Sequence, residues 1–231
     1  MKIIMKIIII VLSVLVISSC GQGNKNKQTV ETKNNQINFN TTIMNKTTFW
    51  EIMERAKDSN TDKMLSNLQK EMQNLSESDV LLFGSYIAAY MQLVSETVWL
   101  DMACKVINGY VSDDTGLYFT LWVISRGETV LLNALQNPDS LAELPEIPWG
   151  NADFEMLMSV GMDYSEELDY EEIEKLQQNA VEEITPTIQF KGGEQFGNYE
   201  EFEDAMKDIP NVLPKLIKRA ESEKFNWKKA F

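Results

Sequence analysis

TVWLDMACKVINGYVSDDTGLYFTLWVIS, residues 97–125, contains two apolar helical segments and the turn between them. The first segment, 97–107, ends at Asn108-Gly109, and a glycine just after the last helical residue is typical of a helix C-terminus. Ser112-Asp113-Asp114 then introduces the second segment, 115–125, because these side chains satisfy free backbone N–H groups and suit the helix dipole. Two apolar helices this close in sequence must bury their faces against each other or against further helices. The pattern therefore predicts an all-α fold.

Further helix signals lie on both sides of this pair. Thr48-Phe49-Trp50-Glu51 matches a capping box, and Ser76-Glu77-Ser78-Asp79 is a second N-terminal signature. Asn137-Pro138 ends a helix, because proline disfavours helical conformation in the residue before it. The other predicted helices are one from Thr48, one at about 61–74, one from Ser76 to Val94 that is expected to be central, and one at 128–136. Residues 48–142 are thus predicted to form a compact domain of about six helices.

The chain becomes strongly acidic after this domain. Residues 143–183 carry thirteen acids against one base, Lys175. Strand evidence is confined to 185–190, where Pro186 weakens it. Short helices are predicted at about 152–162, 170–181, 199–208 and 212–220. Residues 143–231 are therefore predicted to be an acidic, mainly helical C-terminal extension that packs on the domain.

The composition disfavours several classes of function. The chain has no histidine, which removes the usual general base, the imidazole metal ligands and any Ser-His-Asp or Cys-His arrangement. It has no glycine-rich phosphate loop of either common spacing, and its net charge of −14 disfavours nucleic acid and anionic lipid headgroups. The sequence therefore predicts no cofactor, no metal and no nucleic-acid partner, and an enzyme is the less favoured class.

The first twenty residues have the pattern of an export signal. Lys2 and Lys6 precede the apolar run 7–17, which is too short to span a bilayer comfortably. Ile17-Ser18-Ser19-Cys20 resembles the bacterial lipobox. That resemblance implies a diacylglycerol on Cys20, cleavage before it, removal of residues 1–19 as a signal peptide, and attachment to a membrane through the lipid.

Residues 20–47 are rich in Asn, Thr, Gln and Lys and are predicted to be a flexible tether with a reach of roughly 25–30 Å. The expected location is the bacterial cell envelope. Gly21-Gln22 lacks the aspartate that retains enteric lipoproteins in the inner membrane, so the outer membrane is preferred if the source has two. Cys104 lies in the apolar run 99–107 and is predicted to be a buried core thiol.

A family resemblance runs through the predicted domain. The matching residues are Phe49-Trp50, Trp99, Ala103, Asn108-Gly109, Ser112-Asp113-Asp114, Tyr118-Phe119, Trp122, Ile124, Gly127 and Asn137-Pro138-Asp139-Ser140-Leu141. In order and spacing they resemble the bacterial domain of unknown function 4240 over about residues 48–142. This chain has Tyr110-Val111 where the family often has Gly-Cys, and Thr120 where it often has arginine. The resemblance implies a helical bacterial domain and supplies no activity and no catalytic residues.

Ser112, Asp113 and Asp114 are the leading candidates for a site. Two adjacent carboxylates beside a turn could bind a hard cation or a cationic partner group. The favoured interpretation is an N-terminal helix cap, since no third and fourth oxygen ligand follow nearby in sequence. Trp149, between Pro148 and Gly150, is either an exposed interface anchor or a loop side chain that packs back on the core.

Other residues have structural interpretations that are preferred to functional ones. Trp50, Trp99 and Trp122 fall within apolar helical faces and are predicted to be core residues. The acidic run 166–174 is predicted to be a solvated helix start in preference to a docking face.

An interaction or binding protein is the favoured function. An anchor, a tether and an acidic surface together suit docking to a basic protein partner, and an immunity-like role is one form of this. The alternative is a histidine-free enzyme or a cation-binding protein that uses Asp113 and Asp114.

Overall fold

The computed structural model describes residues 44–161 and 170–228. The predicted signal peptide, the lipidation site Cys20 and the tether up to residue 43 lie outside the described residues. So do residues 162–169, which include the beginning of the acidic run.

The described part of the chain is all-α, as predicted, and none of its residues lies in a strand. Among these described helices, none is long and apolar enough to cross a membrane. The α-helices are α2 (Lys46–Ala56), α3 (Thr61–Met72), α4 (Glu77–Val94), α5 (Val98–Asn108), α6 (Asp113–Ser125), α7 (Glu128–Gln136), α8 (Tyr170–Ile184), α9 (Phe202–Val212) and α10 (Pro214–Ser222). Short 3-10 helices are η1 (Pro138–Glu143), η2 (Glu155–Ser159), η4 (Thr185–Thr187) and η5 (Lys191–Gly193).

The ends of α3 to α7 agree with the sequence signals to within about two residues, but the start of α2 does not. The side-chain oxygen of Asn45 accepts a hydrogen bond of 3.0 Å from the Thr48 backbone N–H. Asn45 is therefore the cap, and the predicted cap at Thr48 is wrong because Thr48 is already inside the helix. Met44 is buried as well, so the folded part includes the last residues that were assigned to the tether.

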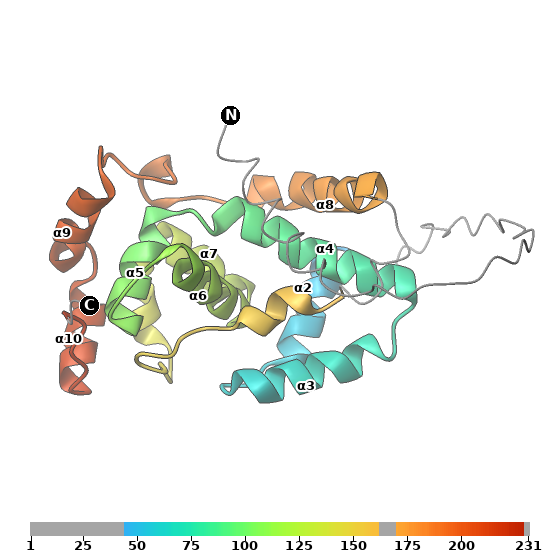
Figure 1. Cartoon of the computed structure of the whole chain (residues 1–231), viewed down its shortest axis with the longest axis horizontal. Coiled ribbons are helices and arrows are strands. Elements are labelled where there is room, and N and C mark those ends of the chain that lie inside the picture. Colours follow the sequence, from blue (N-terminus) through green and yellow to red (C-terminus); the bar gives the residue numbers. More distant parts are fainter. Residues whose placement is uncertain (1–43, 162–169, 229–231) are drawn as a thin grey trace, which may run out of the picture. The chain divides into compact units, whose positions relative to one another are not determined.

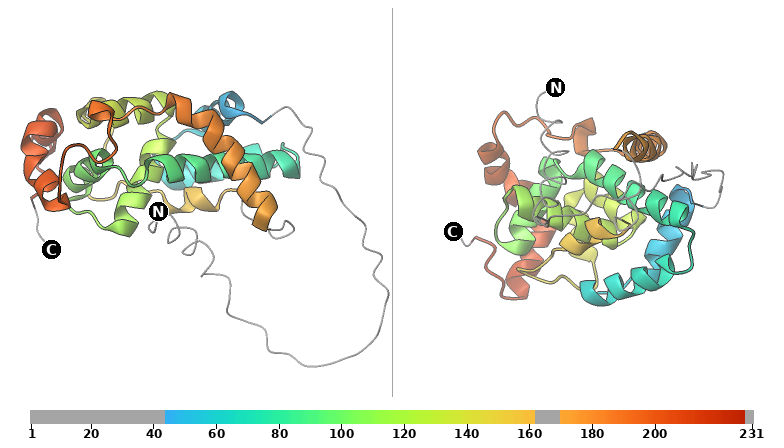
Figure 2. Two further views of the ribbon diagram at one scale, coloured as in Figure 1. Left: turned by 90° about the horizontal axis from the view of Figure 1, so that it is seen from above. Right: turned by 45° about the vertical axis from the view of Figure 1, so that its right-hand side comes forward.

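The core is built around α6. Residues 119–125 of α6 are all buried, and a helix that is buried around its whole circumference must be enclosed by other elements. The helix expected to be central, α4, is also extensively buried, and α8 packs across it (Figures 1 and 2). The predicted core tryptophans Trp50, Trp99 and Trp122 are 8%, 5% and 1% exposed, which confirms that interpretation.

The C-terminal helices are part of the same structure. Figure 1 shows α9 and α10 beside α5, and α10 also contacts η1. The buried carboxylate of Asp139 accepts hydrogen bonds from the backbone N–H groups of Lys215 and Leu216, at 3.1 and 2.8 Å. Asp139 thereby satisfies free N–H groups at the start of α10 and ties this helix to the preceding domain.

Three segments of the C-terminal extension differ from the prediction. The helix predicted at 152–162 is only the short η2 within the described residues, because the backbone before it pairs with α5 and α6. The weak strand candidate 185–190 is not a strand and begins with η4, in which Pro186 occupies a first-turn position. The helix predicted from residue 199 begins at Phe202 instead, since Tyr199 packs against Trp99.

Candidate functional site

Ser112 is the N-cap of α6. Its hydroxyl accepts from the Thr115 N–H at 3.4 Å, and the Thr115 hydroxyl accepts from the Ser112 N–H at 2.7 Å. This is a capping box with threonine in the position more often held by Glu or Gln. These two hydrogen bonds support the prediction that Ser112 is a helix N-cap.

Asp113 and Asp114 occupy the first turn of α6 and are exposed, where their charges suit the positive end of the helix dipole. Asp113 also acts on Asp101, a largely buried carboxyl on α5. Burial raises the pKa of Asp101 to about 7, and the charges of Asp113 and Glu96 add to that effect. The ideal Cβ position at Gly116 lies 2.9 Å from Asp101 Oδ1, so α6 approaches this carboxyl closely.

A loop from Gly150 to Glu155 lies against α5 and α6 and forms one side of a pocket. The Gly150 N–H donates to the Ile107 carbonyl at 2.9 Å, and the Phe154 N–H donates to the Tyr118 carbonyl at 3.1 Å. Between them, Asn108 makes two hydrogen bonds to the backbone of Ala152, accepting from N–H at 2.8 Å and donating to the carbonyl at 3.1 Å. These bonds fix the loop to the C-terminal end of α5 and to the middle of α6.

The pocket between this loop and the helices has a volume of about 300 Å³. We call it the acidic pocket. None of the described residues that line it is basic, and two of them are carboxylates. The lining residues are Asn108, Tyr110, Thr115, Tyr118, Gly150, Asn151, Asp153 and Glu155.

The carboxylates give the acidic pocket its electrostatic character. Partial burial, followed by the charge of Glu155, raises the pKa of Asp153. The Tyr118 hydroxyl donates to Glu155 Oε1 at 3.0 Å, and burial, this bond and the charges of Glu155, Asp114 and Asp153 raise the pKa of Tyr118. Of the predicted site residues, Asp114 is therefore close enough to contribute to the field of the pocket.

Trp149 precedes the pocket loop and packs back onto the C-terminal segment. Its ring stacks on Phe225 with the centroids 5.4 Å apart, and its indole N–H donates to Glu223 Oε2 at 2.7 Å. The side chain is half-buried. Of the two alternatives for Trp149, the packing is what the structure shows, and a role in binding stays a prediction.

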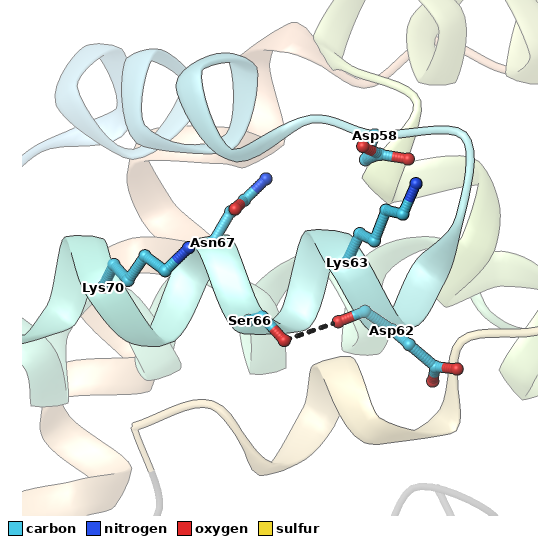
Figure 3. Close-up of a pocket in the computed structure, with 6 residues that line it drawn as sticks. All are labelled: Asp58, Asp62, Lys63, Ser66, Asn67 and Lys70. Atoms are coloured by element: carbon cyan, nitrogen blue, oxygen red, sulfur yellow. Dashed lines mark hydrogen bonds between the residues drawn. The ribbon is translucent and has the colours of Figure 1, made fainter.

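A second hollow, of about 290 Å³, lies along α3 and the turn before it (Figure 3). It is lined by both signs of charge, from Asp58 and Asp62 and from Lys63 and Lys70. The Ser66 hydroxyl donates to the Asp62 carbonyl at 3.0 Å, an interaction within α3 itself. The Asn67 amide donates to the Ala56 carbonyl of α2 at 3.2 Å. Because two acids and two bases line this hollow, its charges balance and favour a ligand of neither sign.

Neither a metal site nor a reactive thiol is found where side chains are described. Residues 44–161 and 170–228 contain no group of three or more Cys, Asp and Glu side chains that could hold a metal ion. Within these residues, Asp113 and Asp114 therefore have no third ligand beside them. Cys104 is buried, which confirms the prediction, and burial raises the pKa of its thiol to about 12.

Sequence reasoning missed the residues that build the acidic pocket. Asp153 and Glu155 counted only as members of an acidic stretch, and Asn108 only as part of a helix end. Tyr118 and its partner Glu155 are 37 residues apart, and Asn108 and its partner Ala152 are 44 residues apart. The available signals were a tyrosine within an apolar helix and an asparagine at the end of another, and neither residue identifies its partner.

The structure defines an all-α domain with a capped turn between α5 and α6. Comparison with known families places it as follows. The family described as protein of unknown function (DUF4240) matches residues 44–183. The chain belongs to this family, and the match extends about 40 residues beyond the resemblance seen in the sequence, so that α8 is included. No curated protein and no solved structure matches the chain.

Proposed function

We propose that this protein is a lipid-anchored component of the bacterial cell envelope that binds a basic protein partner through the acidic pocket. The observation that carries the proposal is a pocket of about 300 Å³ with two carboxylates and no described basic residue in its lining. A lysine or arginine side chain of the partner supplies the missing positive charge. Asp153 and Glu155 accept charge-assisted hydrogen bonds from it, and the rings of Tyr110 and Tyr118 offer faces for a cation–π contact.

The raised pKa of Asp153 predicts that binding of a cation in the pocket depends on pH. A bound cation stabilises the ionised carboxylate, so it lowers the pKa of Asp153 and its binding releases protons. Affinity should consequently fall as the pH is lowered through the raised pKa, because the protonated carboxyl no longer attracts the cation. An Asp153→Asn variant should bind more weakly and show a smaller pH dependence. Equal pH dependence in the variant and the wild type would contradict this role for Asp153.

The pocket is tested by capture from envelope extract with the full chain as bait, at low and at high salt. Asp153→Asn/Glu155→Gln should lose a specific basic partner that the wild type retains at low salt, and high salt should weaken capture by the wild type. The control Glu171→Gln/Glu174→Gln removes the same charge from the exposed face of α8. Equal loss in both variants, or no specific partner at either salt concentration, would refute the pocket as the binding site.

The anchor rests on the lipobox-like sequence and has its own test. Metabolic labelling with a palmitate analogue should label the wild-type chain, and Cys20→Ala should lose the label. An unlabelled and unprocessed wild type would contradict the envelope location. An immunity-like role, in which the partner is a basic toxin neutralised at the envelope, is the more specific form of the proposal. It requires that loss of the anchor or of the pocket sensitises the cell to that toxin.

A further inference from the structure

The loop that follows η5 is firmly attached to the start of α5. The Gln195 carbonyl accepts from the Thr97 hydroxyl at 2.9 Å and from the Val98 N–H at 3.3 Å. The preceding carbonyl, that of Glu194, accepts from the indole N–H of Trp99 at 2.9 Å. Three donors from consecutive residues of one helix start therefore fix two consecutive peptide groups of this loop.

Gly197 continues the attachment beyond these carbonyls. It has a φ of +62°, and a Cβ placed there would lie 2.9 Å from the Trp99 ring. Only glycine allows the backbone to approach this ring in that conformation. Tyr199 then packs edge-on against the same ring, with centroids 6.0 Å apart.

Two phenylalanines are exposed on this fixed segment. Phe196, between the anchored Gln195 and Gly197, is 57% exposed, and Phe202, the first residue of α9, is 47% exposed. Both are among the few large apolar side chains that the described part of the chain leaves open to solvent. Because the backbone beside Phe196 is already held, this loop would lose little further conformational entropy when a partner covers that ring.

Acidic side chains surround these aromatic residues in the sequence. Residues 190–209 carry six acids against two bases, Lys191 and Lys207. Lys207 forms an ion pair with Asp204, and the Lys191 ammonium lies over the Trp99 ring at 6.0 Å from its centroid. The exposed acids of this region are Glu194, Glu200, Glu201, Glu203 and Asp204.

We infer that Phe196, Phe202 and these acids form a docking surface for a basic segment of another protein that carries apolar side chains on one face. We call it the Phe196–Phe202 surface. The apolar side chains cover the two rings, and lysines or arginines meet the surrounding acids. A second copy of this chain would bring the same acids against each other, so charge complementarity favours a different, basic partner. The surface lies beyond the family match, which ends at residue 183, and it shares no residue with the lining of the acidic pocket.

The test uses the full chain in phosphatidylcholine nanodiscs and a fluorescent amphipathic peptide of about 14 leucine and lysine residues. Fluorescence anisotropy should show binding of this peptide, and a counterpart with glutamate in place of lysine should not bind. Phe196→Ser/Phe202→Ser should weaken the affinity about tenfold or more, as expected for exposed aromatic anchors. Tyr170→Ser is the matched control, because Tyr170 is 48% exposed on α8, and it should leave the affinity unchanged.

Hydrogen exchange locates the peptide independently. Amides of residues 194–204 should gain protection in the complex. Equal affinity of wild type and Phe196→Ser/Phe202→Ser, or protection elsewhere, would overturn the inference. Loss of affinity only in Asp153→Asn/Glu155→Gln would do the same, because it would place the peptide in the acidic pocket and leave the proposed function intact. A dimer seen by sedimentation in the wild type but not in Phe196→Ser/Phe202→Ser would identify a second copy as the occupant and refute a basic partner.

Discussion

Replacement of Asn108 by alanine tests how the acidic pocket is built. The Asn108 side chain is 9% exposed, and Ala152, whose backbone it binds twice, is fully buried. The variant leaves one buried N–H and one buried carbonyl without their partner, and each such group costs about 1–3 kcal/mol. Because Asn108 lines the pocket, water can reach part of the vacated space. We therefore expect a loss of about 2–4 kcal/mol, below the upper sum of the two terms.

Urea unfolding of the full chain, followed by circular dichroism at 222 nm, measures this loss. In thermal unfolding, the melting temperature of the variant should fall by roughly 5–15 °C. Its affinity for the basic partner should fall as well, because the loop that carries Asp153 is released. Asn74→Ala is the control, because Asn74 is exposed just after α3 and its side chain bonds to the nearby Lys70 carbonyl of that helix. It should change stability by less than about 0.5 kcal/mol. A similarly small loss for Asn108→Ala would refute the reasoning.

Three further outcomes are expected. Leu121→Ala, at a fully buried position of α6, should lower the free energy of unfolding measured in urea by about 2–5 kcal/mol. Leu117→Ala, at a partly buried position of the same helix, should lower it clearly less. Similar losses would contradict the central place of Leu121. The raised pKa of Asp101, about 7, means that the folded state holds this proton more tightly, so its contribution to stability declines as the pH rises from about 4 to 7. Asp101→Asn should therefore gain stability over wild type, from almost nothing below pH 4 to at most about 4 kcal/mol above pH 7, and a gain independent of pH would refute this. Millimolar calcium or magnesium should leave the wild-type melting temperature unchanged; a large rise that disappears in Asp113→Ala/Asp114→Ala would establish a cation site at the α6 turn.

The sequence predicted those parts of the fold whose signals are local. Ser76 and Ser112 cap α4 and α6 as expected, and Gly109 ends α5 in the left-handed conformation, with a φ of 83°. In each case the residue type acts on a backbone group within one helical turn of itself. The prediction for the start of α2 was wrong because two nearby residues, Asn45 and Thr48, can both act as an N-cap. The local sequence does not show which of them does so.

The acidic pocket depends on pairings that are distant in sequence. The segment from residue 152 has a composition compatible with helix, yet the backbone of Ala152 and Phe154 pairs with Asn108 and Tyr118. Local propensity is a weak prior, and these tertiary hydrogen bonds override it. The acids of the pocket could be counted from the sequence, but the contacts with α5 and α6 that hold their loop in place are properties of the fold.

The C-terminal segment completes the family domain instead of following it as a separate unit. Arg219 on α10 donates to the carbonyls of Ala142, Leu144 and Pro145, and Asp139 satisfies the first N–H groups of the same helix. Removal of α10 would leave the carboxylate of Asp139, which is 5% exposed, without its donors and would open apolar surface that Leu216 now covers. The exposed apolar surface and the two lost hydrogen bonds both reduce stability, so the matched region 44–183 depends on residues outside it. The proposed Phe196–Phe202 surface also lies outside the family match, and the Glu194 and Gln195 carbonyls fix its loop to the start of α5. The residues after 183 thus both stabilise the family domain and carry the proposed docking surface.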